Sequence, residues 1–163
     1  MKILGIDPGT EKSGLVLLDG KDIIFTGVQR NDVVLAGIKA FEYDLLAIEM
    51  IHSQGMKVGK SVFETLAWIG VFAANSTQDF QLVHRPCLKM HLLGTARGSD
   101  ANIRAALIKR LGAPGTKATP GATYGVASHA WQALAVAYCV QEGAKLYCGR
   151  NQLNTNSKLT LTT

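Results

Sequence analysis

Two short apolar segments of this 163-residue chain each end on an acidic residue, and this pattern constrains the fold more than any other feature. Residues 2–7 read KILGID, and residues 44–49 read DLLAIE. Both segments are predicted to be strands. If they lie side by side, they bring Asp7 and Glu49 to one edge of a sheet. Oxygen ligands that converge in this way suit Mg²⁺ or Mn²⁺.

The rest of the chain predicts one mixed sheet covered by helices. Three further strands are expected, at 13–19, 22–28 and 79–84, with a tight Asp19-Gly20 hairpin between the first two of them. Helices are expected at 31–41, 61–74, 100–111 and 125–141. Residues 85–98 are expected to form a basic loop. Strands followed by alternating helices and strands indicate an α/β domain with a five-stranded mixed sheet.

Size and composition fit one domain over residues 1–148, followed by a polar, flexible tail over 149–163. The chain is 47% hydrophobic and 18% charged, which excludes a wholly disordered protein. Its net charge is +5, and residues 85–117 hold seven Lys or Arg but only one acid, Asp100. A basic half suits a polyanionic partner, although an ordinary solvated basic face would have the same composition.

The chain shows no sign of secretion or membrane insertion. Its first residues carry too short an apolar run for a signal peptide, and no stretch reaches 18 apolar residues. None of the three cysteines lies in a C-x-x-C pair, so neither a disulfide framework nor a zinc ribbon is indicated. A cytoplasmic protein with no membrane partner is expected.

A third motif, SHAWQALA, opens the last predicted helix. His129 and Gln132 are three residues apart and would share a helix face, and the alanines around them allow close packing against a sheet. His129 alone could equally be a capping or core histidine. Gln132 is neutral and is a poor ligand for a hard dication.

Taken in order, the segments GIDPG, AIE and SHAWQALAVAY resemble the RuvC-type Holliday junction resolvases, of the ribonuclease H and retroviral-integrase superfamily. The resemblance covers roughly residues 2–142. It implies a ribonuclease H-like fold whose first three strands are antiparallel. It also implies a homodimer that binds branched DNA and cuts four-way junctions in paired nicks.

The resemblance also implies the site. The family's catalytic Asp falls on Asp7 and its Glu on Glu49, and two further acids fall on His129 and Gln132. These four are the predicted catalytic and metal-binding residues. Two Mg²⁺ ions per site, roughly 4 Å apart and replaceable by Mn²⁺, would support hydrolysis. No nucleotide cofactor is implied.

Gln132 departs from the family pattern, because an amide removes a negative charge beside a dication. Either Gln132 is natural and the nuclease is weak or inactive, or it is an introduced change in a catalytic site. The otherwise intact site favours the second explanation. A junction-binding module that has lost its chemistry is the alternative function. A fragment of a sugar-kinase-like or actin-like ATPase, suggested by GIDPGT, would need a duplicated domain and a second phosphate loop, which the chain lacks.

DNA contacts are expected in two places. In the loop after Glu49, His52 stands where the family often has a base-stacking aromatic ring, and Lys57 and Lys60 suit phosphates. Near the penultimate helix, Arg97 and Arg104 take the place of the family's lysines. The N-cap of this helix is expected at Ser99 or Asp100, and Asp100 is interpreted as a cap rather than a DNA contact. Binding should therefore be salt-sensitive and selective for DNA structure.

The helix predicted at 61–74 carries more apolar residues than one buried stripe requires. This excess indicates either a self-interface, consistent with the implied homodimer, or burial in the chain's own core. The short chain and its divergent site residues favour a phage-encoded protein of a bacterial cytoplasm.

Overall fold

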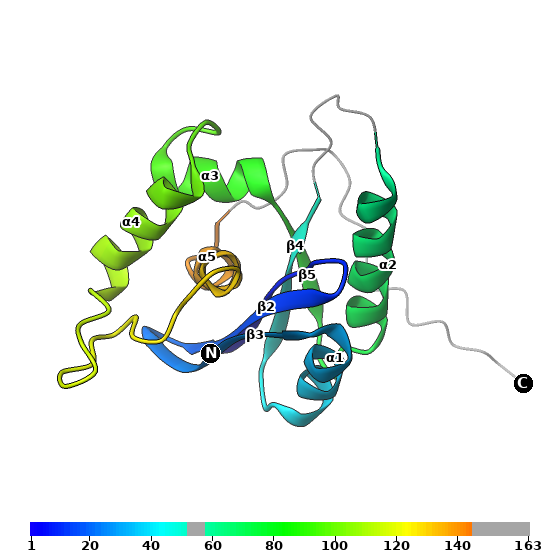
Figure 1. Cartoon of the computed structure of the whole chain (residues 1–163), viewed down its shortest axis with the longest axis horizontal. Helices are drawn as coiled ribbons and strands as arrows, with labels where there is room; N and C mark the ends of the chain where they lie inside the picture. The colour runs from blue at the N-terminus through cyan, green and yellow to red at the C-terminus, as the bar shows by residue number, and fades with distance from the viewer. Residues whose placement is uncertain (52–57, 145–163) are drawn as a thin grey trace, which may run out of the picture.

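A five-stranded mixed sheet forms the middle layer of the protein (Figure 1). The computed structural model describes residues 1–51 and 58–144. The strand order is β3-β2-β1-β4-β5, with bounds β1 (Lys2–Asp7), β2 (Lys12–Asp19), β3 (Asp22–Arg30), β4 (Leu45–Met50) and β5 (Phe80–His84). The first three strands are antiparallel, whereas β4 and β5 run parallel to β1. The predicted sheet is confirmed.

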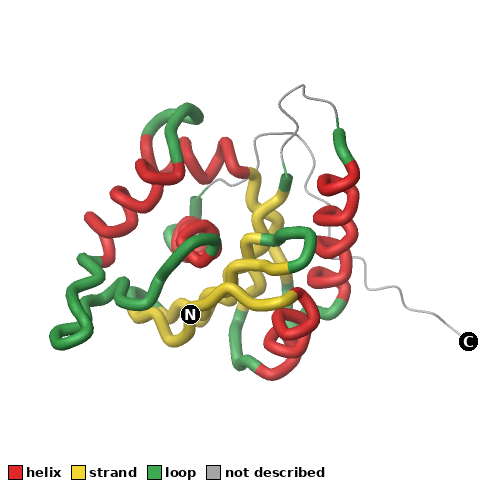
Figure 2. The backbone as a smooth tube through the Cα atoms, viewed as in Figure 1, coloured by secondary structure: helices red, strands yellow, loops and turns green. Residues whose placement is uncertain are grey.

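Helices cover both faces of this sheet (Figures 1 and 2). Their bounds are α1 (Asn31–Ala40), α2 (Lys60–Ala74), α3 (Arg85–Leu93), α4 (Asp100–Leu111) and α5 (Ala130–Gln141). Helices α1 and α2 pack on one face, while α5 lies on the other, with α3 and α4 outside it. The protein is therefore an α/β/α sandwich with two separate apolar cores.

Alternation along the strands places both carboxylates on the α5 face. In β1, Ile3 belongs to the core under α5, whereas Leu4 and Ile6 belong to the core under α1 and α2. Successive strand residues point to opposite faces, so Asp7 points to the α5 side with Ile3. In β4, Ala47 is in the α5 core, and Glu49 follows it by two residues.

Helix α5 lies unusually close to the sheet because glycine faces it. Every residue of α5 from Ala130 to Val140 is buried. A Cβ added to Gly5 of β1 would lie 2.3 Å from the carbonyl oxygen of Ala133 and 2.9 Å from the Cβ of Ala137. The alanine-rich face of α5 therefore fits against a strand position that has no side chain.

The structure differs from the sequence predictions at one additional helix and at the start of the last helix. Residues 85–93 form helix α3 rather than a loop, because Pro86 occupies the start of a helix that buries Cys87, Leu88 and Leu92. The last helix begins at Ala130 rather than at 125. Its approach includes Gly125 and Ser128 with positive φ values of 84° and 49°, which interrupt a helix.

Two other findings bear on the sequence predictions. Cys87 is disulfide-bonded, which neither the cysteine count nor the cysteine spacing indicated. Over residues 1–51 and 58–144, no helix is long and apolar enough to cross a membrane.

Replacing Gly5 by alanine should destabilise the protein by about 1–3 kcal/mol, because its methyl group would overlap backbone of α5. Urea denaturation followed by circular dichroism would measure the loss. Gly70→Ala is the matched control, since Gly70 lies in α2 with nothing within 4 Å of its added Cβ. That control should be neutral or stabilising by up to about 1 kcal/mol. Equal stability of the Gly5 variant and wild type would contradict the packing described here.

Candidate active site

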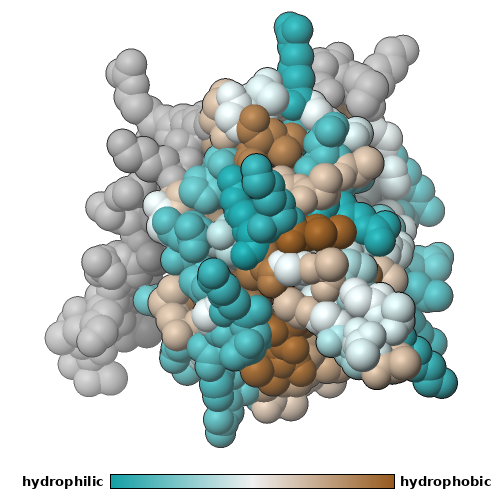
Figure 3. Space-filling model, turned by 90° about the vertical axis from the view of Figure 1, so that its left-hand side faces the viewer, coloured by the Kyte–Doolittle hydropathy of each residue, from teal (hydrophilic) through white to brown (hydrophobic). Residues whose placement is uncertain are grey.

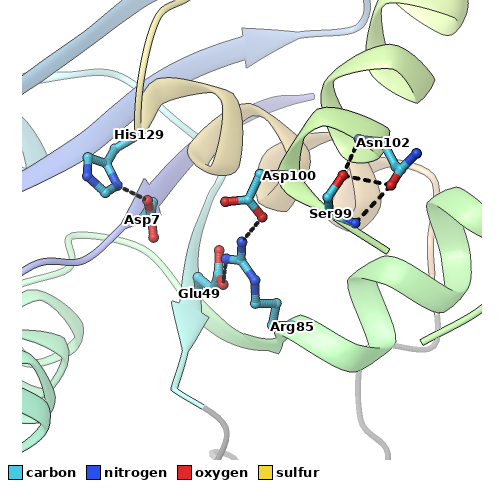
Figure 4. Close-up of polar contacts among 7 residues, drawn as sticks. All are labelled: Asp7, Glu49, Arg85, Ser99, Asp100, Asn102 and His129. Carbon is cyan, nitrogen blue, oxygen red and sulfur yellow. Dashed lines mark hydrogen bonds and ion pairs between the residues drawn. The ribbon is translucent and has the colours of Figure 1, made fainter. Parts of the chain in front are cut away.

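Asp7 and His129 form the first half of the candidate site. The Nδ1 atom of His129 lies 2.9 Å from Oδ2 of Asp7, at the carboxyl end of β1 (Figure 4). Asp7 is largely buried, with 13% of its side chain exposed, whereas 65% of the His129 side chain is exposed. The contact therefore joins a carboxylate in the wall of the site to an imidazole that solvent can reach.

A second glycine brings His129 to Asp7. Gly14 of β2 is the antiparallel partner of Asp7 in the sheet. A Cβ on Gly14 would lie 2.3 Å from the carbonyl oxygen of His129. His129 is the N-cap of α5 and follows Ser128, whose φ of 49° turns the chain into the helix. The close approach at Gly14 and this turn together place the imidazole over the end of β1.

A buried polar network fixes the turn that follows Asp7. The Ser13 hydroxyl donates to Oδ1 of Asn31 at 2.7 Å and accepts from the backbone N–H of Gly9 at 3.2 Å. The Asn31 amide donates to the Gly9 carbonyl at 3.0 Å. Ser13 and Asn31 are both buried. Asn31 is the first residue of α1, and its side chain holds the turn beside Asp7.

Glu49, Arg85 and Asp100 form the second half of the site (Figure 4). The Arg85 guanidinium donates to Oε1 of Glu49 at 2.5 Å and also to Oδ1 of Asp100. Arg85 is the first residue of α3, directly after β5, and β5 lies beside β4 with His84 paired to Met50. Glu49 is 6% exposed, and its Oε2 finds no hydrogen-bond partner among the described residues.

Burial dominates the electrostatics of the two strand-end carboxylates. Desolvation, and after it the charge of Asp7, raise the pKa of Glu49 to about 7 against the opposing pull of Arg85. Desolvation also raises the pKa of Asp7, although the hydrogen bond and charge of His129 lower it. The charge of Asp100 raises both pKa values. Three carboxylates, Asp7, Glu49 and Asp100, thus share the site with the guanidinium of Arg85 and the imidazole of His129.

Gln132 lies in the first turn of α5 and reaches the same region without joining either pair. It is 7% exposed, and its Oε1 has no partner among the described residues. It lines a hollow of about 440 Å³ together with Asp100, Ala101, Arg104, Ser128, His129 and Trp131. The structure thus brings all four predicted site residues, Asp7, Glu49, His129 and Gln132, to one end of the sheet.

The donor set fits a divalent cation in its chemistry, although the carboxylates are engaged with protein cations. Among the described residues, no group of three or more His, Cys, Asp or Glu side chains is arranged to hold a metal. Asp7 is bonded to His129, and Glu49 to Arg85. The partnerless Oε2 of buried Glu49 and the three neighbouring carboxylates suit a hard cation, which Asp7 and Glu49 would hold.

Comparison with solved structures identifies the fold. The chain is similar to RuvC of Thermus thermophilus, with a TM-score of 0.64, 20% identity, and coverage of 88% of this chain and 98% of that one. It is also similar to T. thermophilus RuvC in complex with a Holliday junction substrate, with a TM-score of 0.62, 18% identity, and coverage of 90% and 99%. The chain has the RuvC fold. Neither a protein-family model nor a curated protein sequence matches it.

Within this RuvC fold, the predicted DNA-contacting residues that the structure describes, Lys60, Arg97 and Arg104, lie on different elements. His52 and Lys57 lie outside the described residues. Lys60 begins α2 on the far layer from α5, and its Nζ lies 3.4 Å from the Glu64 carboxylate. Arg97 is exposed between α3 and α4. Figure 3 looks onto the α3–α4 side, where hydrophilic side chains stand out from a surface with apolar areas between them.

Arg104 is a predicted DNA-contacting residue that reaches the candidate site. Its guanidinium lies 5.0 Å from the centroid of the Trp131 ring, and it lines the same hollow as His129 and Gln132. The stacked arginine is therefore held at the mouth of the site by the helix that carries Gln132.

Sequence reasoning missed Arg85 and took Asp100 only for a helix cap. The topology contained a signal for Arg85, because a residue directly after a strand that is parallel to β4 comes to the edge where Glu49 lies. The basic composition of residues 85–98 indicates a loop and hides this signal.

The pKa of Glu49 predicts how metal-free stability depends on pH. In the unfolded chain the pKa of glutamate is 4.5, whereas burial in the folded protein raises the pKa of Glu49 to about 7. The folded state therefore binds more protons, and the free energy of unfolding should fall as pH rises from 4.5 to 7. The loss should be on the order of 2–3 kcal/mol relative to Glu49→Gln, measured by urea denaturation with EDTA present. Parallel pH profiles for the two proteins would contradict the raised pKa.

Proposed function

We propose that this chain is a divalent-metal-dependent endonuclease that resolves four-way DNA junctions by paired nicks. The observation that carries the proposal is the placement of Asp7 and Glu49 on one face at the carboxyl ends of adjacent strands, within a RuvC fold. His129 is bonded to the first carboxylate. Oxygen donors at a sheet edge beside a basic surface suit hydrolysis of a phosphodiester.

Each site residue has a proposed part in the reaction. Two Mg²⁺ or Mn²⁺ ions, when bound, would polarise the attacking water and stabilise the leaving 3′ oxygen. Asp7 would contact both ions, and Glu49 would contact one. His129 with its proton on Nδ1 donates to Asp7, which leaves Nε2 as an acceptor for a proton of the attacking water or as a ligand. Gln132 would orient polar groups in the hollow without adding charge.

The substrate proposal rests on the likeness to RuvC that was solved in complex with a Holliday junction substrate. Phosphate contacts are assigned to Lys57, Lys60, Arg97 and Arg104, and stacking on an unpaired base is assigned to His52. A homodimer would present two sites to two strands. Exposed apolar side chains on α2, Phe63 and Val71, support this assembly. A phage origin remains a prediction.

A junction-binding module without nuclease activity is the second candidate. Two observations favour it: Gln132 is neutral, and Arg85 already neutralises Glu49. Such a protein would keep the basic surface and bind branched DNA, but it would not cut.

A four-way junction assay with Mg²⁺ or Mn²⁺ separates these functions. Wild type should bind the junction in preference to linear duplex and cut it in paired nicks, and Gln132→Asp should cut at least tenfold faster because it restores an acid. Asp7→Asn should bind with unchanged affinity and not cut. Binding would be measured by fluorescence anisotropy, and cutting on denaturing gels.

The outcomes discriminate clearly. If wild type and Gln132→Asp both bind and neither cuts, the non-catalytic module is correct. If neither prefers the junction over duplex, the chain has the fold without the proposed substrate. Thermal melting of each variant confirms that a loss of cutting is not a loss of folding.

Arg104 should contribute to junction binding through phosphate contact. Arg104→Gln is expected to weaken binding several-fold and to reduce the slope of log affinity against log salt by roughly one per contacting subunit. Lys39→Gln is the matched control, because Lys39 is exposed in the last turn of α1 on the opposite layer. An unchanged salt slope for Arg104→Gln would remove Arg104 from the DNA contacts.

A further inference from the structure

Asp100 does not act as the helix cap that the sequence suggested. The N-cap of α4 is Ser99, whose side chain accepts from the backbone N–H of Asn102, while the Asn102 side chain accepts from the backbone N–H of Ser99. Asp100 is the first helical residue, and its carboxylate bonds Arg85 (Figure 4). Its side chain is therefore available to the site and is not needed by the helix.

One cation already joins Asp100 to Glu49. The Arg85 guanidinium contacts Oε1 of Glu49 and Oδ1 of Asp100 at the same time. A carboxylate from β4 and a carboxylate from α4 can thus reach a single positive group between them. Glu49 and Arg85 line one hollow and Asp100 lines a second, so the contact between Arg85 and Asp100 lies between two hollows.

Two buried polar atoms beside this bridge lack partners. Oε2 of Glu49 and Oε1 of Gln132 have none among the described residues, and the two side chains are 6% and 7% exposed. Gln132 lines the same hollow as Asp100 and His129. Buried oxygens without a protein partner are costly, so these two atoms suit contact with a cation or another polar group.

The charges of these side chains also favour a bound cation. Asp100 acts electrostatically on both Asp7 and Glu49, so the three carboxylates share one neighbourhood. Arg85 brings a single positive charge to them. A dication brings two charges in a smaller volume, and it binds carboxylate oxygens without the fixed fork of a guanidinium.

We propose that Asp100 is a ligand of the divalent-cation site and supplies the carboxylate that position 132 lacks. Arg85 is the resident counter-ion, which a cation displaces from Glu49 and Asp100. The inference rests on the proposed metal-dependent function and extends it to this chain's own donor set. It also removes the need to explain Gln132 as an introduced change.

Mn²⁺ binding, measured by isothermal titration calorimetry without DNA, tests the assignment. Asp100→Asn should bind Mn²⁺ at least tenfold more weakly than wild type. Asp32→Asn is the matched control, because Asp32 is also an exposed aspartate paired with an arginine, Arg30, but it lies at the start of α1. The control should bind within twofold of wild type. Equal Mn²⁺ affinity of Asp100→Asn and wild type, or no Mn²⁺ binding by wild type, overturns the proposal.

The Arg85→Met background separates direct ligation from an effect through Arg85. Removing the competing cation should tighten Mn²⁺ binding, and Asp100→Asn should still weaken it tenfold in that background. If the effect of Asp100→Asn disappears there, Asp100 acts only by holding Arg85, and the proposal fails. Circular dichroism checks folding, and the uncharged Arg85→Gln replaces Arg85→Met if the methionine variant does not fold.

The failure of this inference is distinguishable from failure of the proposed function. Wild type that binds Mn²⁺ through Asp100 but neither prefers nor cuts junctions overturns the function and supports the metal assignment. Wild type that cuts junctions while Asp100→Asn binds Mn²⁺ normally overturns the assignment and supports the function.

Discussion

The close approach of α5 to β1 and β2 is the constraint on which the rest of the structure depends. It requires the absence of a side chain at Gly5 and at Gly14, where any Cβ would meet backbone of α5 or of the segment before it. At Gly5 the close approach lets the alanine face of α5 pack directly against β1. At Gly14 it delivers His129 to Asp7. One packing requirement therefore serves both the stability of the sandwich and the geometry of the site.

Burial of carboxylates is the second organising feature. Asp7 and Glu49 lie where desolvation disfavours their charged forms. The His129 imidazole contacts Asp7, and the Arg85 guanidinium contacts Glu49. The compensation is incomplete, because Oε2 of Glu49 has no hydrogen-bond partner among the described residues. A fully compensated site would be more stable but would offer nothing to a cation or to a phosphate.

Most of the sheet and the two strand-end acids could be predicted from the sequence, because apolar runs that end on Asp7 and Glu49 carry a strong local signal. The start of α5 could not be predicted, because the positive φ of Ser128 does not change the spacing of apolar residues in the sequence. Helix α3 was missed because its basic residues mask a short buried face. The role of Asp100 was missed for a different reason: the cap preference explained it locally, whereas its partner Arg85 is brought to it only by the tertiary fold.

The alternation of β1 and β4 divides the molecule into two compartments. Leu4, Ile6, Leu46 and Ile48 face the core under α1 and α2, while their neighbours along the same strands face α5 and the site. A substitution at one of these four residues is therefore tested by folding alone, whereas one on the α5 face of the same strands is tested by folding and chemistry together. An engineer could repack these four positions to raise thermal tolerance and leave the α5 face untouched.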